Sequence, residues 1–159
     1  MTRTDADFMS EAYDEARKSF EAGGLPIGAI LVRGGEIIGR GHNQRVQKGD
    51  PILHGEMDCM RNAGRQKTYR DTVMYTTLSP CMMCTGTILQ FGIPRVVIGE
   101  SRNFAGFQNV LTEAGVEVLD LDDPARDKPA EGPNAIAAVA SGEFSDLPQV
   151  VREELAEAS

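Results

Sequence analysis

Apolar residues recur at helical spacing near the start of the chain. Between residues 5 and 22 they lie mostly three or four positions apart, the period of a helix with one buried face: Phe8, Met9, Ala12, Tyr13, Ala16 and Phe20. Thr4 and Asp7 have the spacing of a capping box, and glycines at positions 23 and 24 favour the end of a helix. The pattern predicts a helix over residues 5–22.

Strand-like and helix-like segments then alternate. Residues 25–44, LPIGAILVRGGEIIGRGHNQ, are typical of two strands around the turn RGGE. Three more strands are predicted over 72–79, 94–100 and 116–121, and three more helices over 54–65, 81–92 and 107–115. This order predicts a mostly parallel sheet with helices on both faces and an antiparallel first pair of strands.

The length of the chain favours one domain. A chain of 159 residues is long enough for a single core and short for two. We therefore expect one domain over 1–159. Within it, the Pro-, Ala- and charge-rich residues 123–145 are predicted to be a linker or loop, and residues 146–159 to form a helix.

The charge of the chain argues against a polymeric nucleic acid as partner. The formal net charge is −8, and basic residues form only short mixed runs such as RQKTYR. Proteins that bind nucleic acid normally present a basic surface. No apolar run approaches the roughly 20 residues that cross a membrane, and the acidic N-terminus does not resemble a signal peptide. We expect a cytoplasmic protein with a small, uncharged substrate and no membrane partner.

Two short segments carry most of the metal-binding chemistry. The chain has two histidines and three cysteines, and HGEMDCM (54–60) and SPCMMCTG (79–86) together contain one histidine and every cysteine. Zinc favours imidazole nitrogen and thiolate, and catalytic zinc keeps three protein ligands and a water. His54, Cys81 and Cys84 supply that number, and both cysteines lie on the first turn of a predicted helix, where thiolates are stabilised. These residues predict a zinc site.

Glu56 adds a proton carrier to this site. It follows His54 by two residues, where its carboxylate can exchange protons with the metal-bound water and the substrate. H-x-E followed by P-C-x-x-C is the pattern of zinc deaminases. The alternatives are a redox CxxC pair and a structural zinc with a fourth ligand. For the latter, Cys59 is better explained as a core residue and His42 as a hydrogen-bonded strand residue.

Longer segments resemble the cytidine deaminase superfamily, and within it the fungal-type cytosine deaminases that act on the free base. These are GGLPIGAIL, GRGHNQRVQKG, LHGEMD, YTTLSPCMMCTGTILQFGIPRVVIGE and NF at 103–104, within residues 10–122. The resemblance implies a three-layer α/β/α fold with a five-stranded mixed sheet, a zinc cofactor and a homodimer. It also implies that His54, Cys81 and Cys84 bind zinc and that Glu56 moves protons.

The same resemblance implies a set of substrate contacts. The Asn43 amide would read the carbonyl edge of the ring, and the Gly55 N–H would contact the pyrimidine oxygen. The Ser79 carbonyl would accept a hydrogen bond from the departing amino group. Ile27 and Phe104 would form apolar walls of the base pocket.

The C-terminus departs from this family. Fungal cytosine deaminases close the pocket with a C-terminal segment that holds Trp and Phe and then an acidic residue, whereas this chain has no Trp. Val151 and Arg152 lie near the aromatic positions and Glu154 near the acidic one. We expect residues 146–159 to be a lid helix with Glu154 turned towards a ring N–H, over a wider pocket. Phe107 or Phe144 could supply the missing aromatic surface.

Together these features predict hydrolytic deamination of a free nucleobase with release of ammonia. Cytosine would give uracil, a reaction of pyrimidine salvage. Isocytosine, an amino-triazine such as azacytosine, and guanine are alternatives, because each contains an amidine-like N=C–NH₂ group. A tRNA-editing deaminase and a non-catalytic zinc domain remain open as further hypotheses.

Overall fold

Helices and strands alternate along the chain in the order that the hydrophobic pattern predicted. The computed structural model describes residues 2–102 and 104–122. Its elements are α1 (Asp5–Glu21), β1 (Gly28–Arg33), β2 (Glu36–His42), α2 (Arg45–Lys48), α3 (Gly55–Ala63), β3 (Thr72–Leu78), α4 (Met82–Phe91), β4 (Arg95–Glu100), α5 (Gln108–Glu113) and β5 (Glu117–Asp120).

One element, α2, was not predicted. It is a single turn of four residues, which is too short to show a hydrophobic period. It ends at Gly49, whose φ of 59° lies in the left-handed region that glycine adopts readily. The predicted cap of α1 is confirmed: the Thr4 hydroxyl accepts from Asp7 N, and the Asp7 carboxylate accepts from Thr4 N at 2.7 Å.

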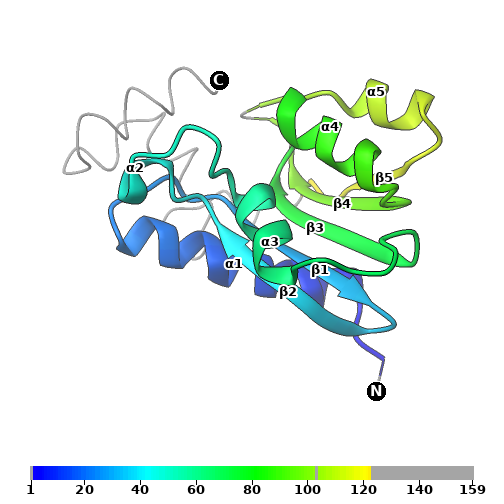
Figure 1. Ribbon diagram of the computed structural model, residues 1–159, viewed down its shortest axis with the longest axis horizontal. Helices are drawn as coiled ribbons and strands as arrows, with labels where there is room; N and C mark the ends of the chain where they lie inside the picture. Colours follow the sequence, from blue (N-terminus) through cyan, green and yellow to red (C-terminus); the bar gives the residue numbers. More distant parts are fainter. Residues whose placement is uncertain (1, 103, 123–159) are drawn as a thin grey trace.

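The five strands form one mixed sheet in the order β2-β1-β3-β4-β5 (Figure 1). β1 pairs antiparallel with β2 and β3, whereas β3, β4 and β5 run parallel. The turn between β1 and β2 contains Gly34 and Gly35 at φ values of 55° and 81°, as tight hairpin turns require. The predicted antiparallel first pair and parallel remainder are confirmed.

Apolar side chains form a separate core on each face of the sheet. α1 covers one face, and α3, α4 and α5 lie on the other (Figure 1). Neighbouring strand residues point to opposite faces. Ile30 and Val32 therefore join the core beneath α1, whereas Ala29 and Leu31 join the core beneath α3 and α4. This arrangement confirms the predicted three-layer α/β/α fold.

The strand directions bring three chain segments to one edge of the sheet. Gly28 at the start of β1 pairs with His42 at the end of β2. β3 runs antiparallel to β1, so its end at Leu78 lies at the same edge. The segments that precede β1, follow β2 and follow β3 meet there. The chain after β2 passes through α2 to α3, and the chain after β3 leads into α4.

Two predicted segments lie outside the described residues. These are the linker over 123–145 and the lid helix over 146–159, with Phe144, Val151 and Glu154 among them. Within residues 2–102 and 104–122, no helix has both the length and the apolar content needed to span a membrane.

A buried carboxylate joins α1 to β2. The Glu15 side chain is 3% exposed, and its oxygens lie 3.1 Å from His42 Nδ1 and 2.7 Å from Lys18 Nζ. Arg40 Nη1 lies 3.4 Å from the same carboxylate, while its Nη2 reaches Glu11. His42 thus has the hydrogen-bonded structural role expected for it.

Glu15 should make the stability of the fold sensitive to acid. Burial acts to raise its pKa, but hydrogen bonds from His42 and Lys18 lower it from 4.5 to about 2. Since the folded pKa is the lower one, this stabilisation is complete above pH 4.5 and is lost as the pH falls towards 2. Between pH 7 and pH 3, the free energy of unfolding should fall by about 2 kcal/mol more in the natural protein than in Glu15→Gln.

Urea denaturation of both proteins at the two pH values, with EDTA present, measures this difference. The same pH dependence in both proteins would show that Glu15 is not the group responsible.

Candidate active site

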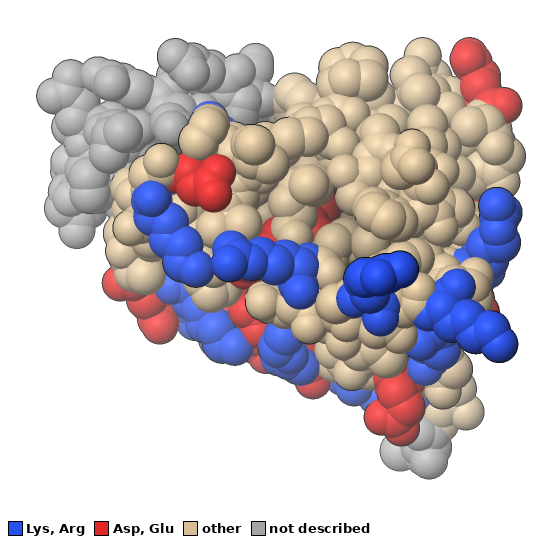
Figure 2. Space-filling model, in the orientation of Figure 1, with Lys and Arg blue, Asp and Glu red and all other residues tan. Residues whose placement is uncertain are grey.

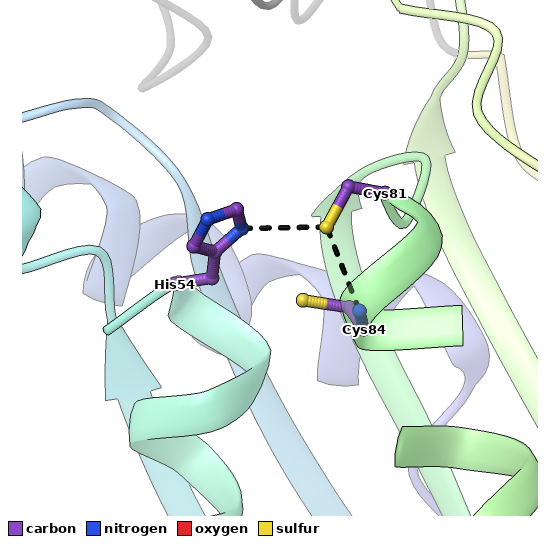
Figure 3. Close-up of side chains that lie close together, drawn as sticks. All are labelled: His54, Cys81 and Cys84. Carbon is purple, nitrogen blue, oxygen red and sulfur yellow. Dashed lines mark hydrogen bonds between the residues drawn. The ribbon is translucent and has the colours of Figure 1, made fainter. Parts of the chain in front are cut away.

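The three predicted metal ligands come together between the starts of α3 and α4. His54 is the N-cap residue of α3, Cys81 is the N-cap residue of α4, and Cys84 follows on the first turn. Their ligand atoms lie within 4.8 Å of one another, and no other such group occurs among the described residues. In Figure 3 both sulfur atoms face the imidazole ring.

The spacing and chemistry of this cluster fit a zinc ion. Zn–S bonds of about 2.3 Å and Zn–N bonds of about 2.0 Å at tetrahedral angles place the two ligand atoms about 3.5 Å apart. His54 Nδ1 lies 3.5 Å from Cys81 Sγ. One imidazole and two thiols supply three ligands, so a tetrahedral ion would keep one position for a small molecule.

In the metal-free cluster, the pKa values of Cys81 and Cys84 are shifted in opposite directions. Hydrogen bonding with Cys84 lowers the pKa of Cys81 to about 4, and the contact with His54 acts in the same direction against the effect of burial. The hydrogen bond to this thiolate raises the pKa of His54. Hydrogen bonding with Cys81, burial and the charge of Glu56 raise the pKa of Cys84. One thiolate and one thiol therefore share the site near neutral pH.

Glu56 lies beside the metal ligands and is 4% exposed. Its Oε2 accepts a hydrogen bond from Cys84 Sγ at 3.0 Å. Its Oε1 points the other way and accepts from Thr76 Oγ1 at 2.6 Å. One oxygen of the carboxylate thus faces the ligand cluster, as a proton carrier for that site requires.

A cavity of about 270 Å³ lies against this cluster. It is lined by Leu25, Ile27, Asn43, Arg45, His54, Glu56, Leu78, Ser79, Cys81 and Phe104. A cavity of this size lies just below the roughly 300–1,000 Å³ of drug-sized ligand pockets, which suits one small ring. Polar groups and apolar walls converge in it, as in small-molecule binding sites.

Asn43 is held rigidly at one side of the cavity. Its backbone carbonyl accepts from Ser19 Oγ at 2.6 Å and from Gln47 Nε2 at 3.0 Å. Its side-chain oxygen accepts from Arg45 N at 3.1 Å. Because the amide oxygen is occupied in this way, the NH₂ group is the end of the amide that can donate to a ligand.

Gly55 is the first residue of α3, and Ser79 directly follows β3 and lines the cavity. A Cβ atom at Gly55 would lie 3.2 Å from Ile27 O, so the helix start packs closely against the cavity wall. The first N–H groups of a helix lack partners within the helix and can bind a ligand. Ser79 is fixed by its N–H, which donates to Glu100 O, and by its hydroxyl, which donates to Ala105 O.

Some residues considered from the sequence lie elsewhere. Cys59 is fully buried in the core beneath α3, as expected. Phe107 is the N-cap residue of α5 and does not line the cavity, so it does not replace the missing aromatic surface. Glu154 lies outside the described residues.

Some lining residues were not identified from the sequence. Leu25 and Arg45 both border the cavity. Each lies within a segment that carries the family resemblance, GGLPIGAIL or GRGHNQRVQKG. Arg45 follows Asn43 by two residues, and its position depends on the short helix α2, which the hydrophobic pattern did not predict.

Known proteins resemble this chain in both sequence and fold. The chain is 51% identical to a cytosine deaminase of Candida albicans over 77% of this chain and 84% of the relative. It is 41% identical to a tRNA-specific adenosine deaminase of Streptococcus pyogenes over 65% of this chain and 63% of that relative. The structure of guanine deaminase from Bacillus subtilis matches with a TM-score of 0.58 and 29% identity, covering 72% of each chain.

A family model provides the most direct assignment. The cytidine and deoxycytidylate deaminase zinc-binding region matches residues 2–100, which include both motif segments. The match covers more than half of the chain and agrees with the resemblance found in the motifs. This protein therefore belongs to the cytidine and deoxycytidylate deaminase family.

Proposed function

We propose that this protein is a zinc-dependent enzyme that removes the amino group of a free nucleobase by hydrolysis, with cytosine as its substrate. The observation that carries this proposal is the position of Glu56, whose Oε2 lies 3.0 Å from Cys84 Sγ at the edge of a small cavity. The 51% identity to a cytosine deaminase favours cytosine among the possible bases.

His54, Cys81 and Cys84 would hold the zinc ion. A zinc ion bound there would supply a nucleophile at neutral pH by lowering the pKa of water. Glu56 would accept a proton through Oε2 and deliver protons to the ring nitrogen and the leaving amino group. The overall reaction consumes one water, breaks the C–NH₂ bond, forms a C=O bond and releases ammonia.

The cavity offers groups that would orient a pyrimidine. The Asn43 NH₂ group and the Gly55 N–H would donate to the ring carbonyl. The Ser79 carbonyl would accept from the amino group that leaves. Ile27 and Phe104 would pack on the two faces of the ring, since both line the cavity.

A tRNA-editing deaminase is the second candidate. Matches to tRNA-specific adenosine deaminases do not support the expectation, drawn from net charge, that nucleic acid is excluded. Figure 2 also shows a row of Lys and Arg side chains across the face that carries α2 and α3. The 51% identity to a cytosine deaminase, compared with 41% to a tRNA-specific adenosine deaminase, favours the free base.

A substrate screen distinguishes these functions. Ammonia release would be measured with cytosine, isocytosine, azacytosine, guanine, cytidine and tRNA, using Glu56→Gln as the blank. We expect the highest kcat/KM with cytosine. Release from tRNA alone would assign the second function, and release from none of the compounds would reject a deaminase.

The metal content gives a test that does not depend on substrate. The purified protein should contain about one zinc per chain. Cys81→Ala combined with Cys84→Ala should abolish zinc retention, because two of three ligands are removed. Cys59→Ala is the matched control and should keep its zinc, since Cys59 is buried in the core. Full zinc content in the double variant, measured by atomic emission, would disprove the assigned ligands.

Removal of the proton carrier tests the role of Glu56. Glu56→Gln keeps the shape of the side chain but cannot cycle a proton, so activity should fall by at least about 100-fold, the lower range for general acid–base catalysis. Zinc content should be unchanged. Glu15→Gln removes another buried carboxylate and should keep its activity at pH 7. Near-normal turnover by Glu56→Gln would show that another group moves the protons.

We also propose that the protein forms a homodimer through the surface of α4. This helix has no charged residue, and Figure 2 shows no Lys, Arg, Asp or Glu over it. Its Met82 and Phe91 are 53% and 44% exposed. Sedimentation should give the mass of two chains for the natural protein and for Leu119→Glu, and one chain for Phe91→Glu. A monomeric natural protein would contradict the proposal.

A further inference from the structure

The buried side chain of Thr76 makes a hydrogen bond to Glu56. Thr76 lies in the middle of β3 and is fully buried. Its Oγ1 is 2.6 Å from Glu56 Oε1 and 3.1 Å from Leu78 O. It is not among the residues that line the cavity, so it does not face a base bound there.

The hydroxyl of Thr76 lies within hydrogen-bonding distance of two acceptors, Glu56 Oε1 and Leu78 O. A hydroxyl has one proton to donate. Hydrogen bonds to a charged acceptor are shorter and stronger than those between neutral groups. The shorter distance is to Glu56 Oε1, so the proton of Thr76 is directed to the carboxylate.

We propose that Thr76 is a positioning residue that orients the Glu56 carboxylate so that its Oε2 serves the ligand cluster. Oε1 accepts the hydrogen bond from Thr76, which leaves Oε2 free of this contact. That oxygen faces the ligand cluster, 3.0 Å from Cys84 Sγ. This inference rests on the proposed role of Glu56 and identifies the residue that aims its carboxylate.

The neighbouring residue Thr77 has a structural role and serves as a comparison for Thr76. The Thr77 hydroxyl accepts from Gly28 N at 3.1 Å and makes no contact with Glu56. Consecutive strand residues point to opposite faces of the sheet. Thr77 is 4% exposed, so it matches Thr76 in type, strand and burial. Thr77→Val is therefore a matched control for Thr76→Val.

The kinetic test separates positioning from stability. Thr76→Val keeps the shape of the side chain and removes the hydroxyl, so kcat should fall roughly 10- to 100-fold, the effect of losing a hydrogen bond to a charged group. KM and zinc content should stay close to the natural values. Thr76→Ser restores the hydroxyl and should recover most of kcat. Thr77→Val should lower the urea midpoint without lowering kcat.

A second readout needs no activity. The urea midpoints of zinc-free natural protein, Thr76→Val, Glu56→Ala and the double variant form a double-mutant cycle. Thr76→Val should lower the midpoint when Glu56 is present, because Oε1 then loses its donor. It should lower the midpoint much less in the Glu56→Ala background.

Two kinetic results would overturn the inference and leave the proposed function intact. One is a normal kcat for Thr76→Val in a protein that Glu56→Gln inactivates. The other is a Thr76→Ser variant that is folded and zinc-loaded but as slow as Thr76→Val. Strictly additive urea midpoints would likewise reject the contact. A natural protein that deaminates none of the bases would instead reject the proposed function.

Discussion

The three candidate metal ligands come from two distant chain segments, and the sheet brings them within a few ångströms of one another. His54 and Cys81 are 27 residues apart, yet their ligand atoms are 3.5 Å apart. Each is the last residue before a helix, and both helices start at the same edge of the sheet. Because β1 runs antiparallel to β3, the loop after β2 and the loop after β3 are at that edge. The strand order therefore determines the geometry of the metal site.

Much of the fold could be predicted because its signals are local. The apolar segments on either side of the RGGE turn predicted β1 and β2, and the Thr4–Asp7 spacing predicted the cap of α1. The cluster of His54, Cys81 and Cys84, which could hold a metal ion, was predictable because histidine and cysteine are rare in this chain and their spacing is specific. The short helix α2 gave no such signal, since four residues cannot show a period. Arg45 was missed for the same reason.

Other features depend on how distant residues meet. Thr76 is an ordinary β-branched strand residue in the sequence, and its contact with Glu56 joins residues 20 positions apart. The distribution of charge is a second case. A net charge of −8 describes the whole chain, whereas the face shown in Figure 2 carries a row of Lys and Arg side chains with Asp and Glu near it. Net charge alone therefore could not exclude a polyanionic partner.

The different pKa shifts of Cys81 and Cys84 have a consequence for how a metal ion would bind between them. Zinc binds thiolates, so an incoming zinc ion would have to displace the proton on Cys84, whose pKa is raised. Loading then competes with acid, and the apparent affinity for zinc should rise with pH. The heat of binding should differ between buffers of different ionisation enthalpy, because the buffer takes up the released proton.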